Sequence, residues 1–400
     1  MKTDKANKQP RVALVCDWLT EIGGAEQVLL SLTKIFPEAP IYTSQYRPKH
    51  APWFSDCKVY SAPILNLLPR CLRKFMAPLR AFYFNHLKIK GYDVVISVAN
   101  SESKGIKTPS DTLHIAYLQG PPTQYYWGKY NEYIANPGFG KLNWLARWGL
   151  KLLLKPMRKS DLKASQRPDI IVANSRYVLR EVKRYYHRDG TVIHPPVRVE
   201  ELGLIKRQIH KQQIDQVRAE LFQGQDFYLV VGRQVNWKRF DLAISACGQA
   251  VENLLVVGDG AEHAKLVNLA KKYPFIKFLP KYNSPAEIAK YFIAARGLIF
   301  PSHEPFGIIP VEALACGCPI LAFSKGGSED IVTPKLNGMF FNQQTTNSLV
   351  LGIKRFNVAQ FDRQKVAESA EPFSKANFKA SWQELLKNNY KEGKNNVGQL

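Results

Sequence analysis

The sequence lacks long apolar runs. No stretch of its 400 residues approaches the roughly eighteen uncharged apolar residues that a membrane-spanning helix needs. The segment from Met1 to Pro10 is polar and lysine-rich and contains no apolar core of a signal peptide. We therefore expect a cytoplasmic protein.

Motifs for metal binding are also missing. The six cysteines form no Cys-x-x-Cys pair, none lies at zinc-finger spacing from histidines, and the chain has no Asp-x-Asp motif. We interpret the cysteines as reduced structural thiols, and we expect no metal ion and no cofactor. They are Cys16, Cys57, Cys71, Cys247, Cys316 and Cys318.

Acidic residues are scarce relative to basic ones. The chain has 56 Lys and Arg against 33 Asp and Glu, a formal net charge of +23, and the excess is larger in the first half. This balance favours a polyanionic partner: nucleic acid, anionic lipid or a phosphorylated small molecule. Nucleic acid is the partner we expect least, because the sequence contains no helix-turn-helix, zinc-finger or RNA-recognition signature.

Short apolar runs alternate with helical patterns along the chain. This alternation, with 45% hydrophobic residues, predicts an α/β fold of two doubly wound, Rossmann-like domains. We place the first domain in residues 1–200, the second in 201–372 and a terminal helix in 373–400. Strands are expected at 11–16, 41–43, 93–98, 113–118, 169–173, 227–232, 254–257, 275–282, 297–301 and 319–323.

Two stretches of the first half, residues 69–90 and 141–163, interleave basic and aromatic residues at helical spacing. In the second stretch, Trp144 and Trp148 accompany several lysines, and Pro156 is expected to end or kink the helix. Basic amphipathic helices suit an anionic membrane interface. The alternative is an ordinary helix that packs its aromatic side chains inward and solvates its charges.

The segment from His303 to Gly317 follows an expected strand and begins a helix near residues 306–310. Gly307 would let backbone N–H groups approach a ligand, and the helix N-terminus adds a partial positive charge, so we expect an anionic group to bind there. Glu304 and Glu312 bracket this glycine and are spaced to face the ligand together. Alternatively, Glu304 caps the helix and Glu312 is a solvated helix position.

Two cations, Arg233 and Lys238, follow the expected strand at 227–232. Arginine binds phosphate bidentately and lysine supplies a point charge, so the pair suits a diphosphate at the carboxyl end of a strand; the alternative is that both are solvated surface charges. Gly23 and Gly24 form a similar turn before a helix expected at 25–36, although they lack Gly-x-Gly-x-x-Gly spacing.

These residues resemble the motifs of a known family. The segment from Glu304 to Glu312 resembles the E-x7-E signature of retaining glycosyltransferases of family 4. The similarity covers nearly the whole chain and is closest to bacterial mannosyltransferases that build O-antigen and other surface polysaccharides. It continues through Gly232-Arg233 with Lys238, Gly258-Asp259-Gly260, Gly326-Gly327 with Glu329, and Gly23-Gly24-Ala25-Glu26.

The resemblance implies a GT-B fold, in which the two domains face each other across a cleft. It implies metal-independent transfer of a hexose, with mannose favoured, from a nucleoside diphosphate sugar to a lipid-linked or saccharide acceptor, with retention of configuration. GDP-mannose is the favoured donor, and UDP-sugars remain open. The second domain would hold the donor and the first the acceptor, with the terminal helix packed back on the first domain. Separately from the resemblance, the two basic amphipathic stretches lead us to expect the protein peripherally on the cytoplasmic face of an anionic membrane.

The resemblance also implies roles for individual residues. Glu312 would bind ribose hydroxyls and Glu304 hydroxyls of the transferred hexose, while Lys281 and Tyr282 would border the nucleotide base. The diphosphate and sugar would be held by Arg233, Lys238, the backbone of Phe306, Gly307, Ile308 and Ile309, and Gly23 with Gly24 from the first domain.

Gln119 departs from the family pattern, which usually has a histidine near the reacting sugar at this position. An amide cannot shuttle a proton near neutral pH. His114, on the preceding strand, is expected to be a packed core histidine rather than a substitute. The departure leaves open a non-catalytic sugar-nucleotide-binding protein. For an enzyme, we hypothesise that the leaving phosphate accepts the proton of the incoming hydroxyl.

A first prediction concerns Gln119. If its role is to position the sugar, Gln119→Ala should slow transfer roughly fivefold to tenfold, the value of one hydrogen bond. Gln119→His should add no inflection near the histidine pKa to the dependence of rate on pH, because the phosphate takes the proton. A new inflection would contradict the hypothesis, and an unchanged rate in Gln119→Ala would exclude this loop from catalysis.

Overall fold

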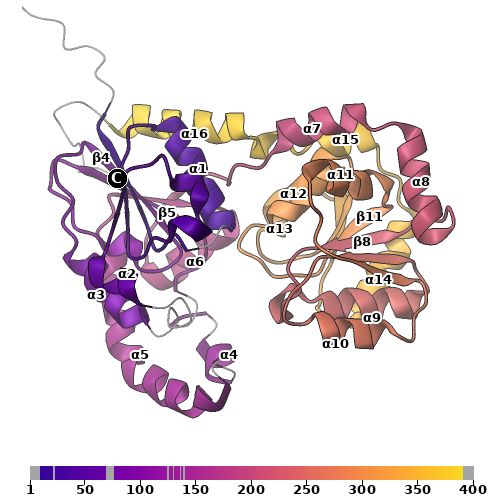
Figure 1. The fold of residues 1–400 in the computed structure, drawn as a ribbon, viewed down its shortest axis with the longest axis horizontal. Coiled ribbons are helices and arrows are strands. Elements are labelled where there is room, and N and C mark those ends of the chain that lie inside the picture. Colours follow the sequence, from indigo (N-terminus) through magenta and orange to yellow (C-terminus); the bar gives the residue numbers. More distant parts are fainter. Residues whose placement is uncertain are drawn as a thin grey trace, which may run out of the picture. The chain divides into compact units, whose positions relative to one another are not determined.

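The computed structural model of the chain describes residues 10–390, except 21–22, 69–75, 124–125, 129, 136 and 138–139. It divides into two compact units (Figure 1). One consists of the described parts of Met1–His194 and Lys379–Leu400, and the other of Pro195–Phe378. Each unit is built on a parallel sheet, which confirms the expected pair of Rossmann-like α/β domains.

The described part of the first unit contains a seven-stranded parallel sheet in the order β3-β2-β1-β4-β5-β6-β7. Its strands are β1 (Val12–Cys16), β2 (Ile41–Thr43), β3 (Val59–Ser61), β4 (Val94–Ala99), β5 (Leu113–Leu118), β6 (Ile170–Ala173) and β7 (Thr191–Val192). Its helices are α1 (Gly24–Ile35), α2 (Pro63–Leu67), α3 (Ala77–His86), α4 (Tyr130–Ala135), α5 (Asn143–Ser165) and α6 (Arg176–Tyr186).

The second unit has a six-stranded parallel sheet in the order β10-β9-β8-β11-β12-β13. Its strands are β8 (Tyr228–Val231), β9 (Leu254–Val257), β10 (Ile276–Leu279), β11 (Gly297–Phe300), β12 (Ile320–Phe323) and β13 (Gly338–Phe341). Its helices are α7 (Val199–Gln208), α8 (Lys211–Phe222), α9 (Phe240–Ala250), α10 (His263–Ala270), α11 (Pro285–Ala294), α12 (Ile308–Ala315), α13 (Ser328–Ile331), α14 (Thr346–Val358) and α15 (Arg363–Glu368).

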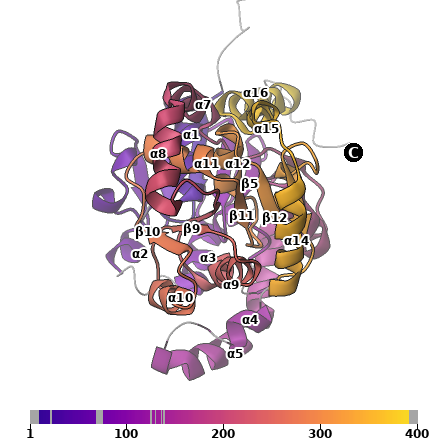
Figure 2. The ribbon, with the colours of Figure 1, turned by 90° about the vertical axis from the view of Figure 1, so that its right-hand side faces the viewer.

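The four central strands of the second sheet, β8, β9, β11 and β12, are buried on both faces. Leu229 and Val231 of β8 belong to one core cluster, with side chains of α11 and α12, whereas Tyr228 and Val230 belong to another, with side chains of α9, α10 and α14. Figures 1 and 2 show α9 and α10 on the opposite side of the sheet from α11 and α12. This two-sided burial explains why the strands could be found in the sequence as continuous apolar runs.

The terminal helix α16 (Lys375–Asn389) passes from one unit to the other along the chain. From Lys379 onward it belongs to the first unit, where Trp382 is fully buried. The Trp382 ring lies 5.9 Å from the ring of Tyr117, a buried residue of β5. The last part of the chain that the structure describes therefore contributes to the core of the first unit.

Three sequence interpretations can be compared with local structure. Pro156 does not end α5, which continues to Ser165, because the following turns are held by buried Met157, Asp161 and Ala164. The described part of the 69–90 stretch forms α3 from Ala77, while residues 69–75 lie outside the described residues. Five cysteines are free thiols and four of them are buried; Cys71 is outside the described ranges.

None of the described helices is both long and apolar enough to span a membrane.

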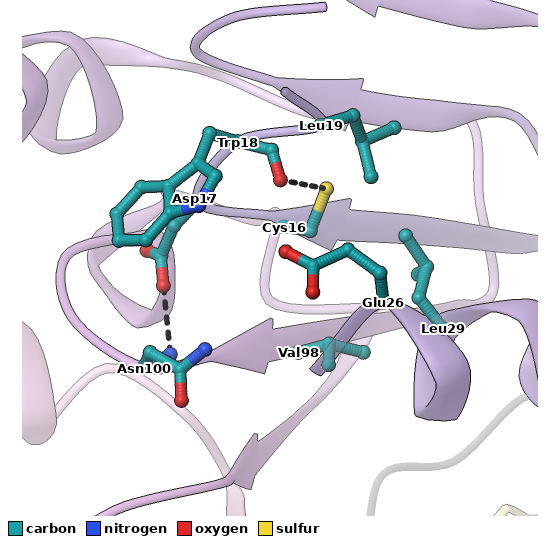
Figure 3. A pocket seen from close by; sticks show the side chains of 8 residues that line it. All are labelled: Cys16, Asp17, Trp18, Leu19, Glu26, Leu29, Val98 and Asn100. Atoms are coloured by element: carbon teal, nitrogen blue, oxygen red, sulfur yellow. Dashed lines mark hydrogen bonds between the residues drawn. The ribbon is translucent and has the colours of Figure 1, made fainter. Parts of the chain in front are cut away.

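Asp17 organises the carboxyl edge of the first sheet. At this edge β1 and β4 are neighbours, and the strand order continues through β2 and β3 on one side and through β5, β6 and β7 on the other. Its buried carboxylate accepts four backbone N–H groups of the loop after β4, from residues 100–103, at 2.7 to 2.9 Å. Figure 3 shows the small pocket at this edge, with Asp17 bonded to Asn100 and with Glu26 of α1 on the opposite wall. A carboxylate is needed here because no neutral side chain accepts four N–H groups.

We predict that Asp17→Ala lowers the free energy of unfolding by about 3 kcal/mol or more, because four buried N–H groups lose their acceptor. Urea denaturation measures this loss. Asp189→Ala is the matched control, since the Asp189 side chain is 86% exposed and should change stability very little. Equal effects of the two substitutions would show that the Asp17 bonds are unimportant.

Candidate functional site

The central contact of the second unit is an ion pair between Lys238 and Glu304. Lys238 ends a short 3-10 helix after β8, and Glu304 lies in the loop after the neighbouring strand β11. The Lys238 Nζ and Glu304 Oε1 atoms are 2.8 Å apart, and each side chain is only about one-seventh exposed, 14% and 13%. The structure thus brings together two of the predicted site residues, from loops 66 positions apart in sequence, at the topological switch point of the sheet.

Helix α12 begins directly beside this pair. Its N-cap is Gly307, whose φ of 110° suits glycine and few other residues. Among the described residues no side chain caps the helix, so the interpretation of Glu304 as its cap is wrong. Within that part of the chain, N–H groups of the first turn remain available to a ligand. The Phe306 side chain is buried, with its ring 5.6 Å from that of Phe373, so this residue can offer a ligand only its backbone.

The loop after β12 packs against the backbone of residues 304–306. The Gly327 N–H donates to the Glu304 carbonyl at 2.9 Å. A Cβ atom on Gly327 would lie 2.1 Å from the Phe306 Cα atom, so only glycine allows this approach. The Glu329 carboxylate accepts the Gly326 N–H at 3.0 Å and holds the turn. The Gly-Gly-x-Glu pattern therefore shapes the loop that carries Glu304.

Gln234 links the loops after β8 and β9 and was not recognised in the sequence. It is fully buried, its Nε2 atom donates to the Gly258 carbonyl at 2.6 Å, and its Oε1 atom lies 2.8 Å from His263 Nδ1. Its backbone N–H donates to the Asp259 carbonyl at 2.8 Å. Because it stands between Arg233 and Lys238, its burial fixes the path of the loop that carries both cations.

Arg233, in contrast, is exposed. Across the part of the chain that the structure describes, its guanidinium makes no hydrogen bond and no ion pair. Lys238, paired with Glu304, is not the solvated surface charge of the alternative interpretation. Arg233 is exposed, as that alternative predicted, and has no protein partner among the described residues. A planar, permanently charged donor in that position is suited to phosphate.

Glu312 is buried inside α12 and forms an ion pair with Arg198, so it is not a solvated helix position. The Arg198 Nε atom donates to Glu312 Oε1 at 2.7 Å. Glu312 Oε2 is also buried and has no hydrogen-bond partner in the described residues. Burial raises the pKa of Glu312, and the Arg198 cation opposes this rise. Arg198 was not predicted as a site residue, because it lies 114 positions away in the sequence.

Tyr282 and Lys281 follow β10 at the same edge of the sheet. Tyr282 is partly buried, and burial together with the nearby Glu312 carboxylate raises its pKa. Lys281 is exposed. The tyrosine thus lies close to the Arg198–Glu312 pair, while the lysine stands at the rim.

The predicted residues of the first unit lie at the carboxyl edge of its own sheet. Gly23 is the N-cap of α1 and both it and Gly24 are exposed. Gln119 follows β5, and its carbonyl accepts a hydrogen bond from Asn174 Nδ2 at 2.8 Å. His114 is buried with its Nε2 atom 2.9 Å from Ser97 Oγ, and burial lowers its pKa to about 3, which confirms a core histidine. In the described residues no cluster of three or more His, Cys, Asp or Glu side chains is placed to hold a metal ion.

Comparison with known proteins gives a family match for part of the chain. Residues 211–372 match the family described as glycosyl transferases group 1. An uncharacterized glycosyltransferase of Methanocaldococcus jannaschii is 31% identical over 164 residues, which are 40% of this chain and 46% of that protein. The chain spans about a third to a half of the length of the curated relatives it matches. The family relationship is thus supported for most of the second unit.

Two solved structures share the fold over nearly the whole chain. Anabaena HepE in complex with UDP has a TM-score of 0.64 at 18% identity, covering 94% of this chain and all of that one. Sucrose-phosphate synthase from Thermosynechococcus elongatus has a TM-score of 0.66 at 17% identity, covering 94% of this chain and 98% of that one. The chain therefore has the GT-B fold of two Rossmann-like domains.

The Arg198–Glu312 pair leads to a prediction about pH. In Arg198→Gln the buried Glu312 carboxylate loses its cation, so its pKa rises further above the unfolded value. A raised carboxyl pKa means that the folded state binds the proton more tightly than the unfolded state does. Stability therefore falls as the pH rises from the unfolded-state pKa of Glu312 through its higher folded-state pKa. The variant should lose about 2–4 kcal/mol relative to the parent at pH 8 and clearly less at pH 5, in urea denaturation.

The double variant Arg198→Gln/Glu312→Gln is the control, because it removes the buried charge as well. It should recover most of the stability lost at pH 8 and show little additional pH dependence. A deficit in Arg198→Gln that is the same at both pH values, or that the double variant does not reduce, would show that the charge of Glu312 is unimportant.

Proposed function

We propose that the chain is a retaining, metal-independent glycosyltransferase that moves a hexose from a nucleoside diphosphate sugar to an acceptor. The observation that carries this proposal is the Lys238–Glu304 pair beside the uncapped N-terminus of α12, with Arg233 exposed on the adjoining loop. These groups offer positive charge for a diphosphate and a carboxylate for sugar hydroxyls within one edge of one sheet. The match of residues 211–372 to group 1 glycosyl transferases supports the same activity.

The reaction needs stabilisation of negative charge on the leaving group. As the bond between the sugar and the diphosphate breaks, the sugar becomes oxocarbenium-like and the leaving oxygen becomes negative. Arg233, Lys238 and the N–H groups at the start of α12 are the donors that stabilise this oxygen, and Glu304 accepts hydrogen bonds from the hexose. The Lys238–Glu304 pair keeps both side chains in place before the donor binds, so they need little rearrangement.

The nucleotide is expected beside Glu312. Its unpartnered Oε2 atom is an acceptor for ribose hydroxyls, and Tyr282 and Lys281 lie at the same edge to border the base. GDP-mannose is the donor we favour from the resemblance of the motifs to mannosyltransferases. A UDP-sugar is the second candidate, because the structurally similar Anabaena protein was solved with UDP and with UDP-glucose.

The acceptor is expected at the carboxyl edge of the first sheet, where Gln119 and the Gly23-Gly24 turn lie. We propose a lipid-linked or saccharide acceptor and a place in the synthesis of a surface polysaccharide. Gln119 would hydrogen-bond the sugar, with the leaving phosphate as the proton acceptor.

We predict that Arg233→Ala and Lys238→Ala each lower turnover at least roughly a hundredfold, because each removes one preorganised donor from the leaving group. Release of the nucleoside diphosphate measures turnover. The two variants should differ in stability. Arg233→Ala should unfold like the parent protein, whereas Lys238→Ala leaves a mostly buried Glu304 carboxylate without its cation and should be less stable.

Lys354→Ala, an exposed charge on α14, is the matched control and should keep full turnover. Near-normal turnover in either Arg233→Ala or Lys238→Ala would contradict the proposed site.

A panel of nucleotide sugars identifies the donor, since a ligand at about a hundred times its Kd stabilises the fold by about 2.7 kcal/mol. Stabilisation without release of nucleoside diphosphate, across acceptors, would indicate a binding protein instead.

A further inference from the structure

Helix α5 of the first unit exposes an unusual number of large apolar side chains. Trp144, Trp148 and Leu152 are 67%, 63% and 61% exposed, and they lie four positions apart, on one side of the helix. Leu145 and Leu153 are also exposed. Figure 1 shows α5 extending away from the sheet of the first unit. Exposed apolar residues that share one helix face mark an interaction surface rather than the scatter of a normal surface.

The same side of the helix becomes basic in its second half. Lys155, Lys159 and Lys163 are exposed, again four positions apart, and Lys151 lies one turn before them. The single acidic residue of α5, Asp161, is buried and paired with Lys104 at 2.7 Å. The outward side of α5 therefore carries apolar and positive groups and no negative group. We call these residues, Trp144, Leu145, Trp148, Lys151, Leu152, Lys155, Lys159 and Lys163, the outer face of α5.

The helix is held firmly at both ends, so its outer face is formed in advance. Besides Lys104, Asp161 accepts hydrogen bonds from Trp127 Nε1 and Tyr186 OH, each at 2.7 Å. Near the other end, Arg147 donates to the carbonyl oxygens of residues 134 and 135 at 2.9 and 2.7 Å, where α4 ends. A surface that is already ordered binds without the entropic cost of folding a segment.

The neighbouring helix α3 also exposes large apolar side chains. Asn85 of α3 donates to Ser160 of α5 at 3.1 Å, so the two helices pack together. On α3, Leu79 and Phe82 are 53% and 65% exposed. The alternative interpretation of the 69–90 stretch was an ordinary helix that packs its aromatic side chains inward. The exposure of Phe82 shows that the aromatic side chains of α3 do not all pack inward.

We propose that the outer face of α5 docks on an anionic lipid surface. Tryptophan and leucine side chains insert at the boundary between headgroups and acyl chains, and the lysines reach the lipid phosphates. Charge decides against a second copy of the chain as the occupant, because two outer faces would bring like-charged lysines together on molecules of net charge +23. This docking goes beyond the proposed transfer reaction and does not depend on it.

The test is cosedimentation of the full chain, without nucleotide sugar, with vesicles of phosphatidylcholine and phosphatidylglycerol or of phosphatidylcholine alone. The parent should bind the mixed vesicles at low salt and bind the neutral vesicles weakly. Lys155→Gln/Lys159→Gln should weaken binding to the mixed vesicles by about thirtyfold, from about 1 kcal/mol per lysine. Trp148→Ser/Leu152→Ser should weaken it by more than about tenfold, because insertion of apolar area is lost.

Matched controls come from exposed residues of the second unit. Leu351→Ser/Val358→Ser removes two side chains that are 60% and 83% exposed, and Lys271→Gln/Lys354→Gln removes two exposed positive charges. Both should bind vesicles like the parent. The proposal is overturned if the outer-face variants bind equally well, or if the controls weaken binding as much. It is also overturned if the parent self-associates in sedimentation equilibrium and Trp148→Ser/Leu152→Ser abolishes that association, since the occupant is then a second copy.

Discussion

A parallel strand that is buried on both faces has no place for a charged side chain. In the second unit β8, β9, β11 and β12 are buried along their whole length, so the ionisable groups of the candidate site have to stand where the strands end. At that edge α12 begins, and its first N–H groups point out of the sheet. The convergence of Lys238 and Glu304 at the carboxyl ends of neighbouring strands follows from this constraint.

Pairing of buried acids is the second organising feature. In both units, five buried or mostly buried carboxylates have a cation or several N–H groups, which offsets the cost of an isolated buried charge. The pairs are Asp17 with the backbone of residues 100–103, Glu102 with Arg80, Asp161 with Lys104, Glu304 with Lys238 and Glu312 with Arg198. Because basic residues outnumber acidic ones by so much, many cations remain for exposed positions, such as Arg233 and the lysines of α5. Those are the positions from which the protein can meet phosphate groups.

The fold was largely predictable because its determinants are local. Buried parallel strands give apolar runs, and a turn such as the one at Gly307 needs glycine whatever surrounds it. The course of α5 through Pro156 was not predictable, because the helix is maintained by contacts of Met157 and Asp161 with distant parts of the chain. A single lost backbone hydrogen bond is outweighed by such packing, which no local pattern reveals.

The residue types of the candidate site were predictable from the sequence, whereas the contacts between those residues were less so. Glycines and charges after strands identified Lys238, Glu304 and Glu312, but the sequence left open whether the carboxylates face a ligand, cap the helix or face solvent. Their ion pairs show that neither carboxylate is a cap or a solvated helix position. Arg198 can be recognised as a partner only once the chain has folded, since pairing across 114 positions has no periodic signature. Gln234 was overlooked for a related reason: a glutamine between two cations looks like a surface residue until its burial is known.

The contacts between glycine-containing loops also constrain how such a protein can diverge. The Gly258 and Gly260 backbones lie against Gly232 and Gln234, and Gly327 lies against Phe306, at distances that leave no room for a side chain. Lengthening any one of these loops would displace the others, so evolution cannot alter them one at a time. Side chains can be exchanged more freely at the exposed positions beside these loops, such as Arg233 and Lys281. Variants of this chain can therefore keep the same loop lengths and differ mainly in a few exposed positions.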